Sequence, residues 1–285
     1  MQVLYVYPNV SGISQRGGLL EHWELAKINN CEFIEIPADF IKKKTEIKKK
    51  TGQNLGEFLK DESIKKIYSK QSIDNKLVKY ILHTEPSLPR NDGFGLRHQA
   101  ALKWYDEDWI NKFIKMNISI SKHFGIPPYG IENHPGDKRN TFKDLKKSIC
   151  LIIESFFKEF NQEPIILLEN RTGQFISNGK QITDFWNSLL NSDLQDKVGI
   201  ILDIQQLYTV TRNKFVDELE IIPLESIKGF HIHHKHRLPT FEDEIPWRIV
   251  FREKINKING GIIINPEIHH KNKVKAVIDF CEMNY

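Results

Sequence analysis

Side chains of the types that bind metal ions follow apolar runs at regular intervals along the chain. They are His83, His134, Glu169, Asp203, His231 and Glu267, in the phrases ILHTEP, GIENHPG, IILLENRTGQ, GIILDIQQ, GFHIHHKH and IIINPEIHH. Imidazoles mixed with carboxylates favour zinc or manganese over magnesium. We expect these six groups to converge on a divalent-metal site, and their number is enough for more than one ion.

The spacing of these groups predicts the elements that position them. From His134 onward the steps are 28 to 36 residues, which suits one strand plus a returning helix. Apolar runs and amphipathic stretches alternate along the chain, the pattern of repeated βα units. The carboxyl ends of all strands in a parallel barrel meet at one mouth. The 285 residues therefore predict a single (β/α)₈ TIM barrel, with residues 1–285 as one domain.

The same patterns place the individual elements. Strands are predicted at 3–7, 32–36, 79–83, 129–134, 165–170, 198–203, 227–233 and 261–267. Helices are predicted at about 18–29, 99–124, 141–160, 183–191, 247–256 and 273–282. Thr141 and Asp144 offer an N-terminal cap for the helix that begins there.

Basic residues in two long polar segments offer contacts to phosphate. Lys42, Lys43 and Lys44 follow the second predicted strand, and Arg90 and Arg97 follow the third. Because loops after barrel strands surround the mouth, these residues favour DNA as a partner. A solvated helix face is the alternative interpretation of the lysine run. The net charge of +4 permits a nucleic-acid partner without requiring one.

Cysteine spacing and hydropathy predict a cytoplasmic protein without a membrane segment. The three cysteines Cys31, Cys150 and Cys281 are far apart and show no redox or metal-finger spacing, which is typical of buried thiols in a reducing compartment. The chain has no apolar run of about 18 residues and no leader pattern at its start.

Several phrases together resemble one family. NHPG, LLENRTGQ, GIILDIQQLY and HIHHKH, followed by a final strand-end Glu, resemble the endonuclease IV family of apurinic/apyrimidinic endonucleases within the xylose-isomerase-like barrels. The resemblance covers essentially the whole chain. It implies a metal-dependent phosphodiester hydrolase that acts on damaged or abasic DNA with about two ions.

The resemblance also implies a role for each ligand. One ion would be bound by His83, His134 and Glu169. A second would be bound by Glu169, Asp203, His231 and Glu267, so that Glu169 bridges the two. Strand alternation independently predicts that His231 and His233 face the barrel interior, with His231 favoured as the ligand. His234 and His236 are expected in the following loop, as substrate contacts or as solvated side chains.

The chain departs from the family at the third ion. The family has a His three residues after the strand-6 Asp, where Gln206 stands here, and an Asp-x-His pair after strand 7, where this chain reads FEDEIPW. A neutral amide is a poor zinc ligand, so we expect the third ion to be absent or weakly held. The alternatives are that Glu242, Asp243 and Glu244 replace it, or that His233 and His236 do.

A different reaction is compatible with the same residues. Sugar or sugar-phosphate isomerases and epimerases of this superfamily hold one ion with the four ligands Glu169, Asp203, His231 and Glu267. Glu169 and Glu267 would then exchange protons with carbon atoms beside a polarised carbonyl. His83 and His134 would contact the substrate. A catalytically degenerate binding protein is a third interpretation, because a fold does not fix a function.

Overall fold

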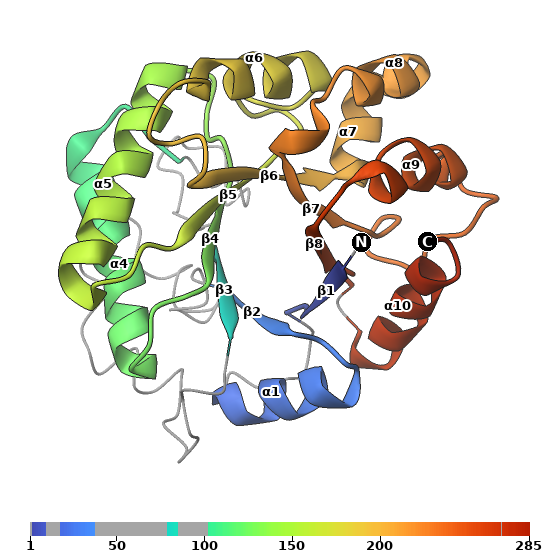
Figure 1. Cartoon of the computed structure of the whole chain (residues 1–285), viewed down its shortest axis with the longest axis horizontal. Helices are drawn as coiled ribbons and strands as arrows, with labels where there is room; N and C mark the ends of the chain where they lie inside the picture. The colour runs from blue at the N-terminus through green and yellow to red at the C-terminus, as the bar shows by residue number, and fades with distance from the viewer. Residues whose placement is uncertain (1, 10–17, 38–78, 85–101, 269) are drawn as a thin grey trace, which may run out of the picture.

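Eight parallel strands close into a barrel in the computed structural model, which describes residues 2–9, 18–37, 79–84, 102–268 and 270–285. Each strand pairs with the next along the chain, and β8 pairs with β1 (Figure 1). The strands are β1 (Gln2–Tyr7), β2 (Phe33–Pro37), β3 (Tyr80–Thr84), β4 (Gly130–Asn133), β5 (Ile165–Glu169), β6 (Val198–Asp203), β7 (Ile227–His231) and β8 (Gly261–Asn265). The predicted (β/α)₈ barrel is confirmed.

Helices surround the barrel on its outer side (Figure 1). They are α1 (Gly18–Ile28), α4 (Glu107–Phe124), α5 (Phe142–Phe160), α6 (Gly179–Leu189), α7 (Ile204–Thr211), α8 (Phe215–Glu220), α9 (Trp247–Glu253) and α10 (Val274–Glu282). Within the described ranges, no helix is both long enough and apolar enough to cross a bilayer.

Side-chain caps explain where the helices differ from the predicted bounds. The side chain of Asp106 accepts a hydrogen bond from the Trp109 N–H, so α4 begins at Glu107 rather than near residue 99. Asn178 and Gln181 form a capping box that starts α6 at Gly179, earlier than predicted. No helix was predicted after β6, where α7 and α8 follow in short succession.

Strand alternation divides the side chains into an outer and an inner layer. The inner apolar cluster fills the barrel below the mouth and consists of Val6, Phe33, Ile81, Leu167, Ile201 and Ile263. Because alternate residues face the same side, the position two residues further along each strand also points inward. On five of these six strands that next position carries a polar group: Glu35, His83, Glu169, Asp203 and Asn265.

An irregularity in the pairing of β6 with β7 determines the position of His231. Ile200 pairs with Ile227, but Ile201 pairs with Gly229, so β7 contains one extra residue at this point. The register beyond the irregularity places His231 directly beside Asp203. Gly229 is needed here, since an added Cβ would lie 2.4 Å from the carbonyl oxygen of Ile263.

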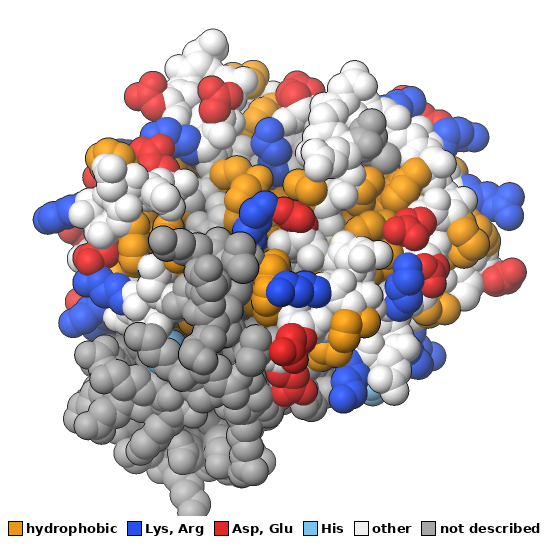
Figure 2. Space-filling model, turned by 60° about the horizontal axis from the view of Figure 1, so that its bottom comes forward, with side chains coloured by type: hydrophobic (Ala, Val, Ile, Leu, Met, Phe, Trp, Pro, Cys, Tyr) orange, Lys and Arg blue, Asp and Glu red, His pale blue; other side chains and the backbone are white. Residues whose placement is uncertain are grey.

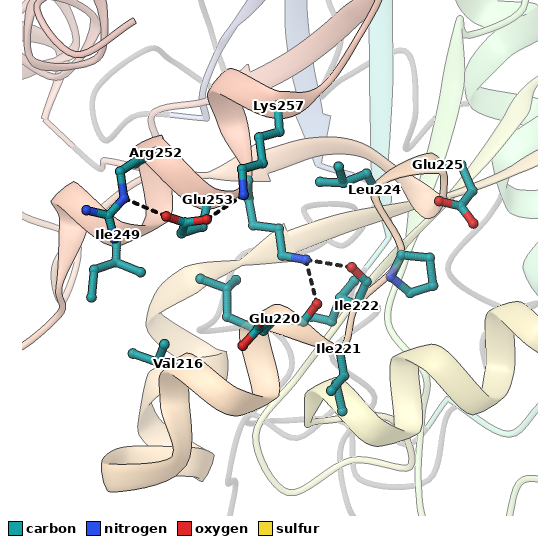
Figure 3. Close-up of a pocket in the computed structure, with 13 residues that line it drawn as sticks. Val216, Glu220, Ile221, Ile222, Leu224, Glu225, Ile249, Arg252, Glu253 and Lys257 are labelled. Carbon is teal, nitrogen blue, oxygen red and sulfur yellow. Dashed lines mark hydrogen bonds and ion pairs between the residues drawn. The ribbon is translucent and has the colours of Figure 1, made fainter.

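A buried lysine ties two outer elements together at the amino-terminal side of β7 and β8. Lys254, only 4% exposed, donates to the carbonyl oxygens of Glu220 (3.1 Å) and Ile222 (2.6 Å) where α8 ends (Figure 3). These three residues line a pocket of about 520 Å³ whose outer edge carries the Glu253–Lys257 ion pair. Burial lowers the pKa of Lys254 from its ordinary value. Lys254 therefore supplies the donors that the end of α8 needs.

We predict that Lys254→Met lowers the free energy of unfolding by about 2 kcal/mol, because two carbonyl groups lose a charged donor while the apolar stem is kept. The exposed Lys257→Met change is the matched control and should cost less than about 1 kcal/mol. Urea denaturation measures both. Equal midpoints for the two variants would contradict this role of Lys254.

Candidate metal centre

The six predicted ligands lie together at the carboxyl ends of the strands. They form two groups whose ligand atoms lie within 4.8 Å of one another: His83, His134 and Glu169, and Asp203, His231 and Glu267. Glu169 lies between the groups. Its Oε2 atom is 2.8 Å from His134 Nε2 and 3.4 Å from His83 Nε2. The same oxygen is 3.9 Å from Nδ1 of His231 in the second group.

The turn after β4 fixes the position of His134. Gly136 in the HPG phrase has φ +81°, and an added Cβ would lie 2.2 Å from the carbonyl oxygen of Leu102. The side-chain Nε1 of Trp104 donates to the backbone oxygen of His134 at 3.2 Å. The chain therefore turns away immediately after the imidazole, which leaves the ring buried against Glu169.

Two buried carboxylates that the sequence analysis did not single out hold the histidines. Glu35 Oε1 accepts a hydrogen bond from His83 Nδ1 at 2.7 Å. Glu132 Oε1 lies 2.9 Å from His231 Nε2. In each ring the opposite nitrogen faces Glu169, and a carboxylate on one nitrogen of a histidine orients the other toward a metal ion. Strand parity was the available signal, since Glu132 stands two residues before His134.

His233 has the opposite arrangement. Its Nδ1 accepts a hydrogen bond from the backbone N–H of His236 at 3.1 Å, which assigns the ring proton to Nε2. That nitrogen lies 2.8 Å from Glu267 Oε2 and 3.6 Å from Asp203 Oδ2. In this tautomer Nε2 of His233 holds these carboxylates, whereas Nε2 of His231 lies against Glu132 and leaves Nδ1 for an ion. Nε2 of His233 and Nδ1 of His231 are both buried without a hydrogen-bond partner among the described residues. His231 as the ligand therefore stays a prediction, which the tautomer of His233 favours.

The remaining loop histidines contact other residues. His234 Nδ1 lies 2.7 Å from Asp243 Oδ1, and Asp243 Oδ2 accepts from Trp247 Nε1 at 3.2 Å. The His236 ring stacks on His233 with centroids 4.7 Å apart. Asp243 therefore stabilises the loop between β7 and α9. Neither Asp243 nor His234 belongs to the two ligand groups.

Gln206 is engaged away from the ligand atoms. Its side-chain Oε1 accepts from the backbone N–H of Thr172 at 3.1 Å, which joins α7 to the loop after β5. Its backbone N–H donates to Asp203 Oδ1 at 2.8 Å, as the first-turn cap of α7. The amide at this position stabilises a loop. The alternative that His233 and His236 replace the missing ligands stays open, because ligand atoms of His233, His236 and Glu267 lie within 4.8 Å of one another.

The predicted phosphate contacts Lys42, Lys43, Lys44, Arg90 and Arg97 lie outside the described residues. On the face drawn in Figure 2, Lys and Arg side chains are interspersed with Asp and Glu side chains over the described part of the chain. A DNA partner therefore stays a prediction from the sequence.

The buried imidazoles and carboxylates of the centre stabilise each other's charged forms. Burial opposes the charged form of His83, but Glu132, Glu169 and Glu35 outweigh it and raise its pKa well above the ordinary value. Burial also opposes ionisation of Glu169, yet the imidazoles of His134 and His231 lower its pKa well below the usual range. Protons on His83 and His231 thus balance the carboxylates, and a divalent ion would compete with those protons.

The buried donor atoms fit a divalent ion. Among the described residues, several of these atoms are buried without a hydrogen-bond partner: His83 Nε2, Glu169 Oε1, Asp203 Oδ2, His231 Nδ1, His233 Nε2 and Glu267 Oε2. Unsatisfied buried groups of this kind are costly unless an ion or water satisfies them. Nitrogen and carboxylate oxygen in this proportion suit zinc or manganese.

Comparison with known proteins shows the fold. No protein-family model matches the sequence, and no curated protein sequence matches it. Among solved structures, a D-allulose 3-epimerase from Methylomonas sp. is similar at 12% identity and a TM-score of 0.61, over 100% of this chain and 98% of that one. An AP endonuclease, family 2, from Brucella melitensis is similar at 11% identity and a TM-score of 0.54, over 99% and 98%. The fold of this chain is a (β/α)₈ barrel similar to those of these solved structures.

The two histidines of the second group give a paired test. We predict that His231→Gln weakens zinc binding at least about 10-fold, because it removes a lone pair that faces Glu267. His233→Gln should retain the ion content of the wild type, since an amide can reproduce both the N–H donor and the acceptor. Elemental analysis after dialysis and calorimetric titration measure the difference. Greater loss in His233→Gln would reverse the assignment.

Proposed function

We propose that this protein is a divalent-metal-dependent phosphodiester hydrolase that binds about two zinc or manganese ions and acts on damaged or abasic DNA. One observation carries the proposal. Glu169 lies within reach of two ligand groups at once, with His83 and His134 on one side and His231 on the other. A carboxylate so placed can bridge two ions, which is the arrangement that phosphoryl transfer uses.

The bracing of His83 supports a second ion. A single-ion enzyme would need only Glu169, Asp203, His231 and Glu267 as ligands. Yet Glu35 fixes one nitrogen of His83, and the other nitrogen faces Glu169 with no hydrogen-bond partner among the described residues. This is the geometry of a metal ligand with its supporting carboxylate rather than that of a mobile substrate contact.

The protein holds the ligand side chains in fixed positions and shields them from bulk water. Two ions bound by these ligands would activate water and offset negative charge on a phosphoryl group. Glu35 and Glu132 hold the imidazoles of His83 and His231 in place, so the ligand atoms need little reorganisation. Glu169, Asp203 and His231 are fully buried, which excludes bulk water from the ligand atoms.

A sugar or sugar-phosphate epimerase is the second candidate. His231 Nδ1 lies 3.3 Å from Glu267 Oε2 and 3.9 Å from Glu169 Oε2. The two carboxylates therefore flank one ligand position, as an acid–base pair around a single ion requires. D-psicose and D-allulose 3-epimerases are among the similar folds. This candidate leaves His83 without a metal to bind.

His83→Gln separates the two reactions. We expect the metal-loaded wild type to cleave bis(p-nitrophenyl) phosphate and, slowly because Gln206 replaces a ligand of the family's third ion, an abasic duplex. His83→Gln should lower cleavage by on the order of 10² to 10³, since one ion loses a ligand. His234→Gln is the control, because His234 pairs with Asp243 outside both groups. Cleavage is followed by nitrophenol release and gel analysis.

Two results of this experiment would contradict the proposed hydrolase, and each points to a different alternative. Epimerisation of a ketose that survives His83→Gln, without phosphodiester cleavage by the wild type, would replace the proposal with the single-ion epimerase. Tight metal binding with neither reaction would favour the catalytically degenerate binding protein.

A further inference from the structure

A buried amide lies where the barrel closes, between the two ligand groups. Asn265, only 2% exposed, ends β8 and belongs to the inward-facing layer. Its side-chain Nδ2 donates a hydrogen bond to Glu35 Oε2 at 3.1 Å. The same nitrogen lies 3.5 Å from His231 Nε2 on the neighbouring strand. Asn265 therefore contacts both the carboxylate that supports His83 and a ligand of the second group.

The contact between Asn265 and Glu35 reaches past one strand. Glu35 is on β2, and β1 lies between β2 and β8 in the sheet. Glu35 Oε2 also accepts a hydrogen bond from the backbone N–H of Asn9, just after β1, at 3.1 Å. Its Oε1 accepts from His83 Nδ1 at 2.7 Å. Donors from three segments thus hold both oxygens, so the carboxylate cannot rotate without losing a hydrogen bond.

A side-chain amide suits this position because it donates without adding charge. Only the nitrogen of the carboxamide can donate to Glu35, which fixes the orientation of the Asn265 side chain. A carboxylate in its place would repel Glu35, and an apolar side chain would leave Glu35 Oε2 with one donor instead of two. We propose that Asn265 is a positioning residue of the first ligand group: it holds Glu35 in the orientation that turns His83 Nε2 toward an ion.

This inference deepens the proposed function and rests on it for the presence of two ions. A single-ion enzyme would use only the second ligand group, and the support of His83 would then have no effect on metal binding. With two ions, loss of the Asn265 amide should weaken the ion beside His83 and spare the ion beside His231. Asn265 therefore sets the ratio of the two affinities.

Calorimetric titration of the metal-free protein with zinc tests the inference. Asn265→Leu keeps a branched side chain of similar size and removes the donor. We expect it to weaken the ion beside His83 about 10-fold and to leave the affinity of the second ion unchanged. Asn117→Leu is the matched control, because Asn117 is a buried amide on α4 that donates to the Phe113 carbonyl at 2.9 Å. This control should retain both ions at the affinities of the wild type.

Two double variants separate positioning from a general structural role. In a His83→Gln background, Asn265→Leu should cost no zinc affinity, since the second group binds the ion that remains. Combined with Glu35→Gln, it should cost less than the sum of the two single losses, because Asn265 acts through Glu35. Where Asn265→Leu does not fold, Asn265→Ala replaces it, since alanine removes the amide without adding bulk. Additive losses with Glu35→Gln, or weaker binding of the ion that remains in the His83→Gln background, would overturn the inference.

The inference and the proposed function fail separately. Two zinc ions whose affinities do not depend on Asn265 would overturn the inference and leave the proposed hydrolase intact. Two ions that depend on Asn265, in a protein that cleaves no phosphodiester, would keep the inference and overturn the hydrolase. A wild type that binds a single zinc ion would overturn both.

Discussion

Buried charge at one end of the barrel is the constraint on which the rest of the structure depends. Five carboxylates and four imidazoles are buried or nearly so around the mouth: Glu35, Glu132, Glu169, Asp203 and Glu267, and His83, His134, His231 and His233. Ionised groups out of water are costly unless they are paired or bind a metal ion. Each imidazole therefore faces at least one carboxylate, and the ring orientations follow from those contacts.

The barrel satisfies this constraint by separating the charged layer from the apolar one. Below the mouth the inner side chains are apolar, and one alternation step further along the strands they become polar. The irregularity in β7 brings His231 level with Asp203. A shift of one residue would turn His231 toward the helices and leave Asp203 without its neighbour. Strand register and site chemistry are thus set together.

The ends of strands were the part of the site that sequence reasoning could predict. Glu169 and Asp203 close strands that are otherwise apolar, where an ionised group is costly unless it is paired or bound to a metal ion. Glu35 and Glu132 lie inside their strands, where a short run with one polar residue also resembles a solvent-facing position. Only their alternation with inward apolar residues distinguishes them. Asn265 ends its strand, but its contact with Glu35 joins positions that are 230 residues apart in the sequence.

The helices around the barrel were predicted less accurately than the strands, because some of them are short or depend on contacts with distant segments. Long amphipathic helices such as α5 follow from periodicity, and the Thr141–Asp144 capping box confirms the predicted cap. The helix α8 spans only Phe215–Glu220, too short for a periodic pattern, and its end depends on Lys254 from a distant segment. Such a contact between separate segments is not readable from either one alone.

The central claim is that Glu169 joins two ion sites. Diffraction from zinc-loaded crystals at the zinc absorption edge tests it most directly, because anomalous difference maps locate each ion independently of the protein atoms. The account predicts two peaks per chain, one beside His83 and His134 and one beside Asp203, His231 and Glu267, with Glu169 between them. A single peak at the second position, with His83 bound only to Glu35 at full zinc loading, would contradict it.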